Sequence, residues 1–586
     1  YNTRTGRRIA RDIDSADARG ITLSGTYIYK LKKAGLYSGN IVGRKLGKIE
    51  VEVPSADYRI GNKAPTQKGN KFFIKIRNEK QAKEYFEDLG RRLGLKENQN
   101  DADVVNFRKI LTGMYNDAKK AGLPVRAFRE NYFPNQLKEQ YLKFLGSDIF
   151  KMIEKDPAFE TQKFNNKSYI IENIENILGS SKLNKETKKA FDHIAEQLVK
   201  EAKENGYTLS SRAAKADAFL KIRDSIYKQR YSNSGNLVKS RTANFPEYMY
   251  ERDARLVLTK YANDVAKNVA NAEFFGAKNE KINIAIAELQ GLKKKAESSN
   301  NVRAKETIEK EIAWLNQAFN SWNNMIEVDP TKNWKDPRAR NFWKATTDFE
   351  VATKIGLGYA TIPNITQTLI STAVKAGYYN TLKGTFNLVR NPVINLPNNK
   401  KIKYRDMISK SGLSNLSVFQ MISGLEPADT VFGRAAHRIT KLSGFQDINK
   451  LNQFIAAAAG NEYAKNLVDV VNGRGTGLSR LKSKSWARDN LRQLGLPENV
   501  KNLSERQSLE AMYRFSRDAP LQRNILNDPM VFNAPRFRPF FLFKRFGYKQ
   551  FNWVRENVGR EVLVHGNVLP LLRLGVGGFF GAQFVI

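Results

Sequence analysis

Cysteine is absent from this chain of 586 residues, and histidine occurs only three times, at His193, His437 and His565. The lack of cysteine excludes disulfides, zinc–thiolate sites, iron–sulfur clusters and a cysteine nucleophile. The three histidines lie far apart in the sequence, without the close spacing of a histidine metal site. The sequence therefore predicts no metal and no cofactor.

Recognisable catalytic motifs are also lacking. The chain has no glycine-rich phosphate loop ending in Lys-Ser/Thr, no HExxH, no GxSxG and no calcium-binding loop. The segment GRGTG at 473–477 lacks the dinucleotide-binding spacing and is typical of a turn. Basic and aromatic residues in close alternation are then the remaining chemical signal.

Positive charge is in large excess, because 98 Lys and Arg face 59 Asp and Glu, which gives a formal net charge of +39. So basic a chain repels itself unless an anionic partner is near, and DNA, RNA or an anionic lipid surface would each serve. A solvated charged surface is the alternative. Hydrophobic residues make up 41% of the chain, which is enough to build folded cores rather than a disordered polymer.

Hydrophobic periodicity predicts a mainly α fold, an extended multi-helical assembly protein with a small strand-containing N-terminal region. Residues 1–77 indicate a basic arm and short strands, because β-branched and aromatic residues alternate between Gly, Asn and Pro; the strands include residues 21–31. Residues 78–235 indicate a helical domain, and 236–330 a long helical hairpin broken near 298–301. Residues 331–586 form the expected C-terminal helical domain, with basic-aromatic and apolar glycine-rich segments.

Acidic residues are missing from 352–389, where Lys354, Lys375 and Lys383 are the sparse charges. If this segment is helical, its small and apolar residues predict burial on most sides or contact with lipid. Pro363 near its middle predicts a kink or two separate helices.

The densest basic and aromatic alternation lies at 532–560, and a shorter one lies at 333–344. Rings beside cations suit a membrane interface, a nucleic acid, or a buried helix whose charges reach solvent. The i,i+3 spacing of Tyr548 and Phe551 favours packing against a neighbouring helix. The candidates for contact with DNA or a neighbouring subunit are Arg536, Arg538, Lys544, Arg545, Lys549, Arg555, Lys335, Arg338 and Arg340.

The chain ends in an apolar, glycine-spaced run at 568–586, which is about long enough to span a bilayer. Arg573 lies inside this run, so a small-residue helix that packs closely on others is the better interpretation. Since the chain starts at Tyr1 and stops within an apolar run, we expect it to be part of a longer polypeptide. The candidates for packing or membrane contact are Phe541, Phe546, Trp553, Gly575, Gly578, Phe579 and Phe580.

Five segments in roughly the last 40% of the chain carry a family resemblance. In this order they resemble the C-terminal part of the large internal virion (DNA-ejection) proteins of short-tailed bacteriophages and of related large polyvalent phage proteins. AFRENYFPNQ at 127–136 resembles, less specifically, a proline motif of the same proteins. The five segments are IPNITQTLIS (362–371), NKLNQFIAAAAGNEYA (449–464), FSRDAPLQRN (515–524), LNDPMVFNAPRFRPFFLFKRFGYKQ (526–550) and GNVLPLLRLGVGGFFGA (566–582).

The resemblance implies a structural protein stored inside the capsid, as part of an oligomeric core above the portal. It would leave with the genome and help to build a DNA-translocation conduit across the host envelope. The implied partners are other copies of the chain, the portal, other internal core proteins, packaged double-stranded DNA bound nonspecifically, and the host membrane after ejection. A basic, cysteine-free and helix-rich chain agrees with storage beside DNA and passage through a narrow tail.

Two other functions stay open. Family members often carry a peptidoglycan-cleaving domain, and such an enzyme needs a Glu whose pKa is raised by an apolar pocket. Glu130 is the nearest candidate, but Arg126 and Arg129 would lower its pKa, and the proline turn at 131–134 explains the motif. No catalytic residue is therefore predicted here. The other alternative is a nonspecific DNA-binding protein whose affinity falls with salt.

Overall fold

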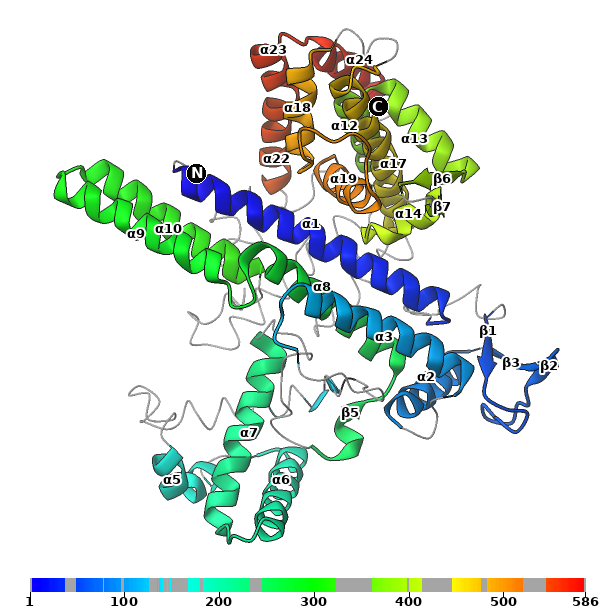
Figure 1. Cartoon of the computed structure of the whole chain (residues 1–586), viewed down its shortest axis with the longest axis vertical. Coiled ribbons are helices and arrows are strands. Elements are labelled where there is room, and N and C mark those ends of the chain that lie inside the picture. The colour runs from blue at the N-terminus through cyan, green and yellow to red at the C-terminus, as the bar shows by residue number, and fades with distance from the viewer. Residues whose placement is uncertain are drawn as a thin grey trace. The chain divides into compact units, whose positions relative to one another are not determined.

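The structure is a computed structural model whose chain forms two compact units (Figure 1). The first unit combines Tyr1–Tyr29 with Val269–Ile586, and the second is Lys30–Asn268. The structure describes residues 3–36, 49–76, 78–95, 100–125, isolated positions between 134 and 148, 167–179, 183–231, 245–322, 361–397, 400–413, 445–475, 482–519 and 544–583.

The prediction of a mainly α fold is confirmed, while the bounds of the four expected parts stay a prediction. Two helices belong to both units: α1 (Arg4–Lys33), which lies mostly in the first, and α8 (Ala254–Phe275). The other helices of the second unit are α2 (Glu79–Gly94), α3 (Ala102–Lys120), α5 (Lys167–Gly179), α6 (Lys185–Glu204) and α7 (Ser211–Tyr231), with a 3₁₀ turn at Glu247–Met249. The other helices of the first unit are α9 (Glu280–Ser298), α10 (Val302–Trp322), α12 (Thr361–Ala376), α13 (Tyr378–Arg390), α14 (Tyr404–Lys410), α17 (Phe445–Val471), α18 (Lys484–Gln493), α19 (Glu505–Asp518), α22 (Lys544–Val554), α23 (Arg560–His565) and α24 (Leu569–Gln583), with a π-helical turn at Arg555–Gly559.

The described strands are short and antiparallel. In the second unit, β1 (Ile49–Val53), β3 (Lys71–Ile76) and β2 (Thr66–Lys68) form a sheet in that order, and β4 (Gln136–Leu137) pairs with β5 (Tyr250–Glu251). In the first unit, β6 (Val393–Leu396) and β7 (Lys400–Lys403) form a hairpin with Val393 opposite Lys403. The expected strands at the end of the region 1–77 are therefore present as β1 to β3.

The sequence predicts an extended strand at residues 21–31. This prediction is wrong, because these residues continue α1 without a break. Their β-branched residues favour strands. In the helix, however, the hydroxyls of Thr22 and Thr26 donate to the carbonyls four residues earlier, both at 2.9 Å. A Cβ on Gly25 would lie 2.3 Å from the backbone nitrogen of Gly412, so glycine permits close contact there. Tertiary packing thus overrides local propensity.

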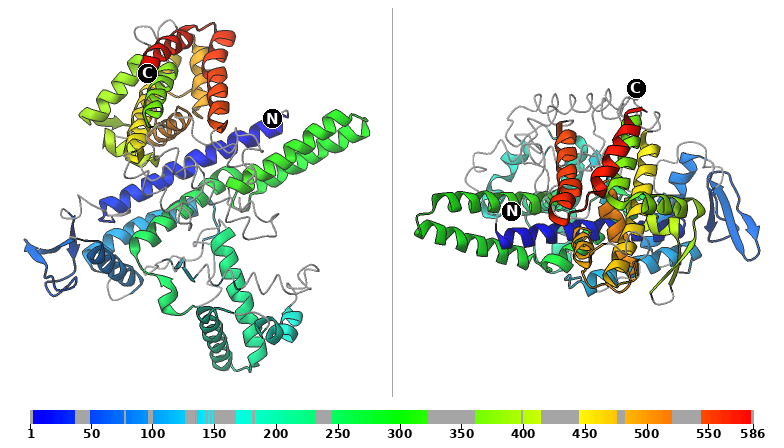
Figure 2. Two further views of the ribbon diagram at one scale, coloured as in Figure 1. Left: turned by 180° about the vertical axis from the view of Figure 1, so that it is seen from behind. Right: turned by 90° about the horizontal axis from the view of Figure 1, so that it is seen from above.

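In the first unit, α1 runs beside the hairpin of α9 and α10 in both orientations (Figures 1 and 2). Ile9 and Ile13 of α1 belong to the same buried cluster as Leu289 of α9 and Leu315 of α10. The hairpin turns between Ser298 and Val302, so its predicted break is confirmed.

Helix α17 is the centre of the remaining bundle in the first unit, with α12, α13, α18 and α19 packed around it. Its run of four alanines, 456–459, is fully buried. A Cβ on Gly384 of α13 would lie 2.6 Å from the carbonyl carbon of Ala458. Small residues on both helices therefore allow their backbones to come close together.

The second unit carries its own polar junction around one buried arginine. Arg92 of α2 contacts Asp88, Asp101 and Asp103, with nitrogen–oxygen distances of 2.8, 3.0 and 2.8 Å. Burial alone would lower the pKa of Arg92, but the hydrogen bond and charge of Asp103 outweigh it and the pKa is raised. The charge is thus held in place by carboxylates and has a structural role.

Candidate ligand pocket

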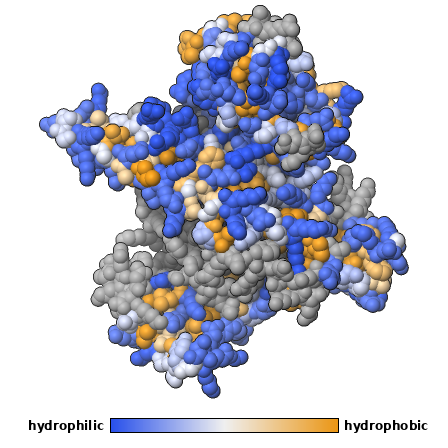
Figure 3. Space-filling view, in the orientation of Figure 1, coloured by the Kyte–Doolittle hydropathy of each residue, from blue (hydrophilic) through white to orange (hydrophobic). Residues whose placement is uncertain are grey.

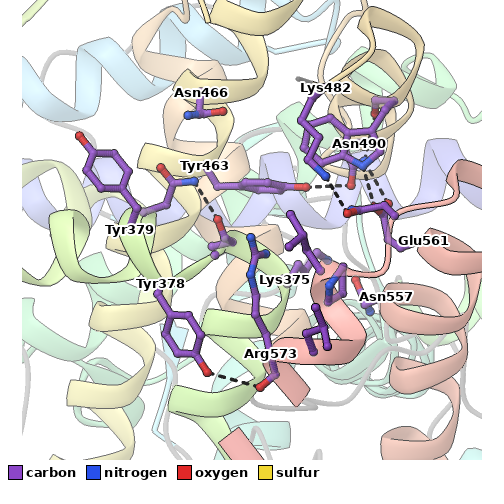
Figure 4. A pocket seen from close by; sticks show the side chains of 18 of the residues that line it. Lys375, Tyr378, Tyr379, Tyr463, Asn466, Lys482, Asn490, Asn557, Glu561 and Arg573 are labelled. Carbon is purple, nitrogen blue, oxygen red and sulfur yellow. Dashed lines mark hydrogen bonds between the residues drawn. The ribbon is translucent and has the colours of Figure 1, made fainter. Parts of the chain in front are cut away.

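A cavity of about 730 Å³ in the first unit lies among α12, α13, α17, α18, α23 and α24 (Figure 4). Its wall includes three cations, Lys375, Lys482 and Arg573, and two carboxylates, Glu556 and Glu561. Tyrosines and asparagines supply most of the other polar groups. Its size and mixture of apolar wall with a few polar groups are typical of small-ligand sites.

Local backbone features place the lining residues. Gly377, between α12 and α13, has φ of +86°, and a Cβ there would lie 3.2 Å from a guanidinium nitrogen of Arg573. Only glycine suits this conformation and this close contact. Ser483 caps α18 by accepting the backbone N–H of Trp486 at 3.1 Å, which fixes the start of the helix that carries Trp486 and Asn490.

Glu561 is 7% exposed and is satisfied by neutral donors. Its carboxylate accepts the indole N–H of Trp486 and an amide N–H of Asn567, both at 2.6 Å. A second amide, from Asn490, lies at 3.4 Å. The other carboxylate, Glu556, lies 3.5 Å from Arg555. Both carboxylates of the wall therefore have partners other than the pocket cations.

Lys482 and Arg573 are half-buried, and within the described part of the chain neither lies within 4.0 Å of a carboxylate oxygen. Lys482 Nζ donates to Asn567 Oδ1 at 2.6 Å and lies 5.2 Å from the centre of the Trp486 ring. Arg573 Nη1 donates to the carbonyl of Val374 at 3.3 Å. Their hydrogen bonds are thus to neutral acceptors, which leaves the charges uncompensated at short range.

Burial lowers the pKa of Lys482, against an opposing effect of Glu561 and with a further decrease from Arg573. Burial also lowers the pKa of Arg573. An arginine stays protonated at neutral pH even so. Lys375 differs, because it lies 3.5 Å from Asp518 and 5.5 Å from the centre of the Phe515 ring.

The mouth of the pocket is apolar and aromatic. Tyr378 and Tyr379 start α13 on one side, and Leu572 and Val576 of α24 line the other. Tyr379 is 70% exposed and Leu572 is 59% exposed. The hydroxyl of Tyr378 donates to the carbonyl of Arg573 at 3.4 Å, which connects the two sides (Figure 4). The pocket therefore combines cations inside with exposed apolar groups at its opening.

Beyond the mouth, α13 exposes a further apolar row, which we call the α13 row. It consists of Leu382, Phe386 and Val389, which are 69%, 60% and 68% exposed. Their spacing of four and three residues places them on one face of the helix. Hydrophobic residues are visible at the surface over α13 (Figure 3). From 378 to 405 the sequence has six Lys or Arg and no Asp or Glu, so this apolar face has basic surroundings.

Few of the candidates from the sequence can be placed, and none of the placed ones lines the pocket. The structure describes only the backbone of six candidates. Three of them belong to α22, namely Lys544, Arg545 and Phe546, and three to α24, namely Gly578, Phe579 and Phe580. Lys549 is half-buried in α22, and Arg555 is exposed beside Glu556. The candidates wholly outside the described residues are Arg536, Arg538, Phe541, Lys335, Arg338, Arg340, Glu130 and His437.

The structure describes the surroundings of three residues from the C-terminal segments that were predicted to pack against other helices. Trp553 is buried in one cluster with Val374 of α12 and Val558. Phe551 is 67% exposed, so it does not pack against a helix within the described chain. A Cβ on Gly575 would meet open space. Contact with another molecule at these two positions stays a prediction.

One feature of the sequence could have indicated the pocket, namely the single charge of Arg573 in the apolar run at 568–586. Lys482, Trp486 and Glu561 had no motif, because the pocket is assembled from helices separated by up to about two hundred residues. No described helix is both long and apolar enough to cross a membrane. Among the described residues, no three His, Asp or Glu side chains gather in a way that could hold a metal ion.

Comparison with known proteins adds no relative. No protein-family model, no curated protein and no solved structure matches the chain.

Proposed function

We propose that this protein is a structural internal virion protein of a short-tailed bacteriophage. It forms part of an oligomeric core above the portal, bound to other core proteins and, nonspecifically, to packaged double-stranded DNA. It leaves with the genome and helps to build a conduit for DNA across the host envelope. Its work is assembly and translocation rather than catalysis.

The observation that carries this proposal is the α13 row. Leu382, Phe386 and Val389 expose large apolar side chains side by side on one helix face. A monomeric soluble protein rarely leaves a contiguous apolar patch uncovered, whereas subunits of an assembly cover such patches with one another. The row supports contact with a second copy of the chain.

Charge supports the same proposal. The formal net charge of +39 suits a protein stored beside packaged DNA, since phosphates offset its self-repulsion. The order of the five segments between 362 and 582 resembles that of internal virion proteins and supports a location inside the virion. Neither argument alone distinguishes a core protein from a DNA-binding protein, and the exposed row favours the former.

Mass measurement of the purified protein, by light scattering after size-exclusion chromatography, tests the assembly. We expect a concentration-dependent oligomer that Leu382→Ser with Phe386→Ser converts to monomers. Leu256→Ser with Ile284→Ser is the matched control, because both residues are exposed leucine or isoleucine outside the row. A wild-type protein that stays monomeric at every concentration, or a control pair that dissociates the oligomer equally, would contradict the proposal.

A further inference from the structure

The pocket described above has a chemistry that the α13 row and the net charge do not explain. Two half-buried cations, Lys482 and Arg573, point into one cavity and hydrogen bond to neutral oxygens. Placing a charge in a partly dry site is costly unless a counter-charge is near. Elsewhere in the same wall Lys375 has such a partner in Asp518, at 3.5 Å. The other two cations lack one within the described part of the chain.

The wall's own carboxylates offset these two charges only in part, because the negative charge of Glu561 favours the protonated forms of Lys482 and Arg573 from beyond 4.0 Å and balances one charge of the two. Glu561 is held by the indole of Trp486 and by the amides of Asn567 and Asn490. Glu556 faces Arg555. An anion from outside the chain would therefore complete the pocket. A phosphate suits such a pair, because the planar N–H donors of arginine can bind two of its oxygens while lysine supplies a second positive charge.

The opening of the pocket selects among phosphates. Tyr378, Tyr379, Leu572 and Val576 surround it, and each is at least partly exposed. A free phosphate or a DNA backbone would gain nothing from these apolar groups. The acyl chains of a lipid would cover them, and tyrosine is enriched at membrane interfaces for the same reason.

The surroundings of the mouth agree with a charged bilayer surface. The acid-free segment from 378 to 405 starts at the mouth and carries Arg390 and four further cations in β7 and at the start of α14, whereas its other cation, Lys383, is paired with Glu462 of α17 at 3.1 Å. Basic residues next to exposed apolar ones are typical of surfaces that bind anionic lipid.

We propose that this pocket binds the phosphate headgroup of an anionic phospholipid through Arg573 and Lys482, with the acyl chains lying over Leu572, Val576 and the two tyrosines. The site goes beyond the proposed assembly function, because it does not use the α13 row. In the proposed conduit it would attach the C-terminal bundle to the surface of the host membrane.

Dihexanoyl phosphatidylglycerol below its micelle concentration is a suitable probe, since it presents one headgroup with short chains. The full chain is titrated with it, with the phosphatidylcholine analogue and with sn-glycerol 3-phosphate. We expect saturable binding of the phosphatidylglycerol, with both other probes weaker by about tenfold or more. Equal affinity for sn-glycerol 3-phosphate would identify a free-phosphate site, and equal affinity for phosphatidylcholine would remove the role of charge. Either result overturns the proposal, as does the absence of binding.

Arg573→Gln with Lys482→Gln should weaken phosphatidylglycerol binding by about tenfold or more. The control is Arg303→Gln with Lys294→Gln, which removes the same two charges from exposed positions of α10 and α9 and should change binding less than twofold. Equal losses in both pairs would show that only net charge matters. Circular dichroism checks that each variant folds.

A second pair keeps the test valid if the pocket variant does not fold. Leu572→Glu places a negative charge at the exposed mouth, and Leu563→Glu places the same charge on α23, where the side chain does not line the pocket. Only Leu572→Glu should weaken lipid binding. The same variants are also titrated with a short DNA duplex, whose affinity should not change between the pair. If Leu572→Glu weakens DNA and lipid binding equally, the pocket is a nucleic-acid site and the lipid proposal is wrong.

The oligomer test and the lipid test fail separately. A protein whose Leu382→Ser and Phe386→Ser variant is monomeric but binds phosphatidylglycerol normally keeps the lipid site. A protein that forms oligomers but does not bind phosphatidylglycerol would support the proposed assembly function and contradict the lipid site.

Discussion

The junction of α1 with α19 and the pocket beside α24 hold pairs of cations in opposite ways. At the junction, Arg514 and Arg517 are buried, and each lies 2.7 Å from a carboxylate oxygen of Asp14. Arg517 also lies 3.5 Å from Asp17. In the pocket, Lys482 and Arg573 have only neutral oxygens as hydrogen-bond partners within the described residues.

The difference separates charges that stabilise the fold from charges that are available to a ligand. A buried ion pair that is complete holds two elements in register, and breaking it leaves an unpaired charge behind. A cation without a close counter-charge destabilises the fold slightly, and such perturbed groups are concentrated at binding and catalytic sites. The comparison predicts opposite effects of neutral substitutions in the two regions.

The largest effect is expected at the junction. Arg517→Met would leave Asp14 with Arg514 as its remaining cation and Asp17 with only the hydroxyl of Tyr513, at a cost of about 3 kcal/mol in the free energy of unfolding. Urea denaturation measures it. Arg506→Met in the same helix is the control, because Arg506 is half exposed and its pairs with Glu273 and Glu510 should contribute at most about 1 kcal/mol. An equal decrease in the free energy of unfolding in both variants would show that the buried pairs of Arg517 stabilise the fold no more than exposed pairs do.

Acid should weaken the same junction. Burial alone would raise the pKa of Asp14, but Arg517 and Arg514 outweigh it, and the pKa is lower than usual. A carboxyl whose pKa is depressed in the fold stabilises it at pH above the unfolded value, and this contribution is lost as pH falls through the folded value. The free energy of unfolding should therefore decrease toward low pH less steeply in Asp14→Asn than in the wild type. A variant with the full acid dependence would show that Asp14 has no part in it.

A smaller effect of opposite sign is expected at the pocket. Burial lowers the pKa of Lys482, so its protonated form is less stable in the fold than in the unfolded chain. Lys482→Met should leave the melting temperature unchanged or slightly higher while it weakens binding of phosphatidylglycerol. A large drop in melting temperature would mean that Lys482 is a structural charge like Arg517.

The smallest effect concerns the pH dependence of lipid binding. The groups that face Lys482 are Glu561, Arg573, Asn567 and Trp486, and of these Arg573 stays protonated. Binding by the wild type should weaken as pH rises through the lowered pKa of Lys482, below the range of an ordinary lysine. Lys482→Arg should move this loss to higher pH, which a titration of lipid affinity against pH measures. An identical profile in both proteins would exclude Lys482 from the site.

The sequence predicted the fold class and part of the helix order, because apolar residues recur at helical spacing. It misplaced residues 21–31, where Ile21, Thr22 and Thr26 favour strands by local propensity and tertiary contacts hold them in α1. The break of the α9–α10 hairpin was predictable, since the residues 299–301 are polar and lack the apolar spacing.

The pocket was not predictable in the same way. Its cations come from positions 482 and 573 and its mouth from positions 378 and 572, so only the packing of α12, α13, α18 and α24 brings them together. Residues 532–560 were predicted to contact DNA or a neighbouring subunit because aromatic and basic residues are dense in this segment. Such density does not say which charges find a partner, whereas the structure shows that Arg514 and Arg517 do.

The location of this chain in the virion tests the proposed function most directly. Cryo-electron microscopy of particles before and after DNA release should show an oligomer of the chain above the portal in full particles only, with lysine and arginine side chains facing the DNA. A chain found outside the capsid, present as isolated copies, or still above the portal after the genome has left would contradict the proposed function.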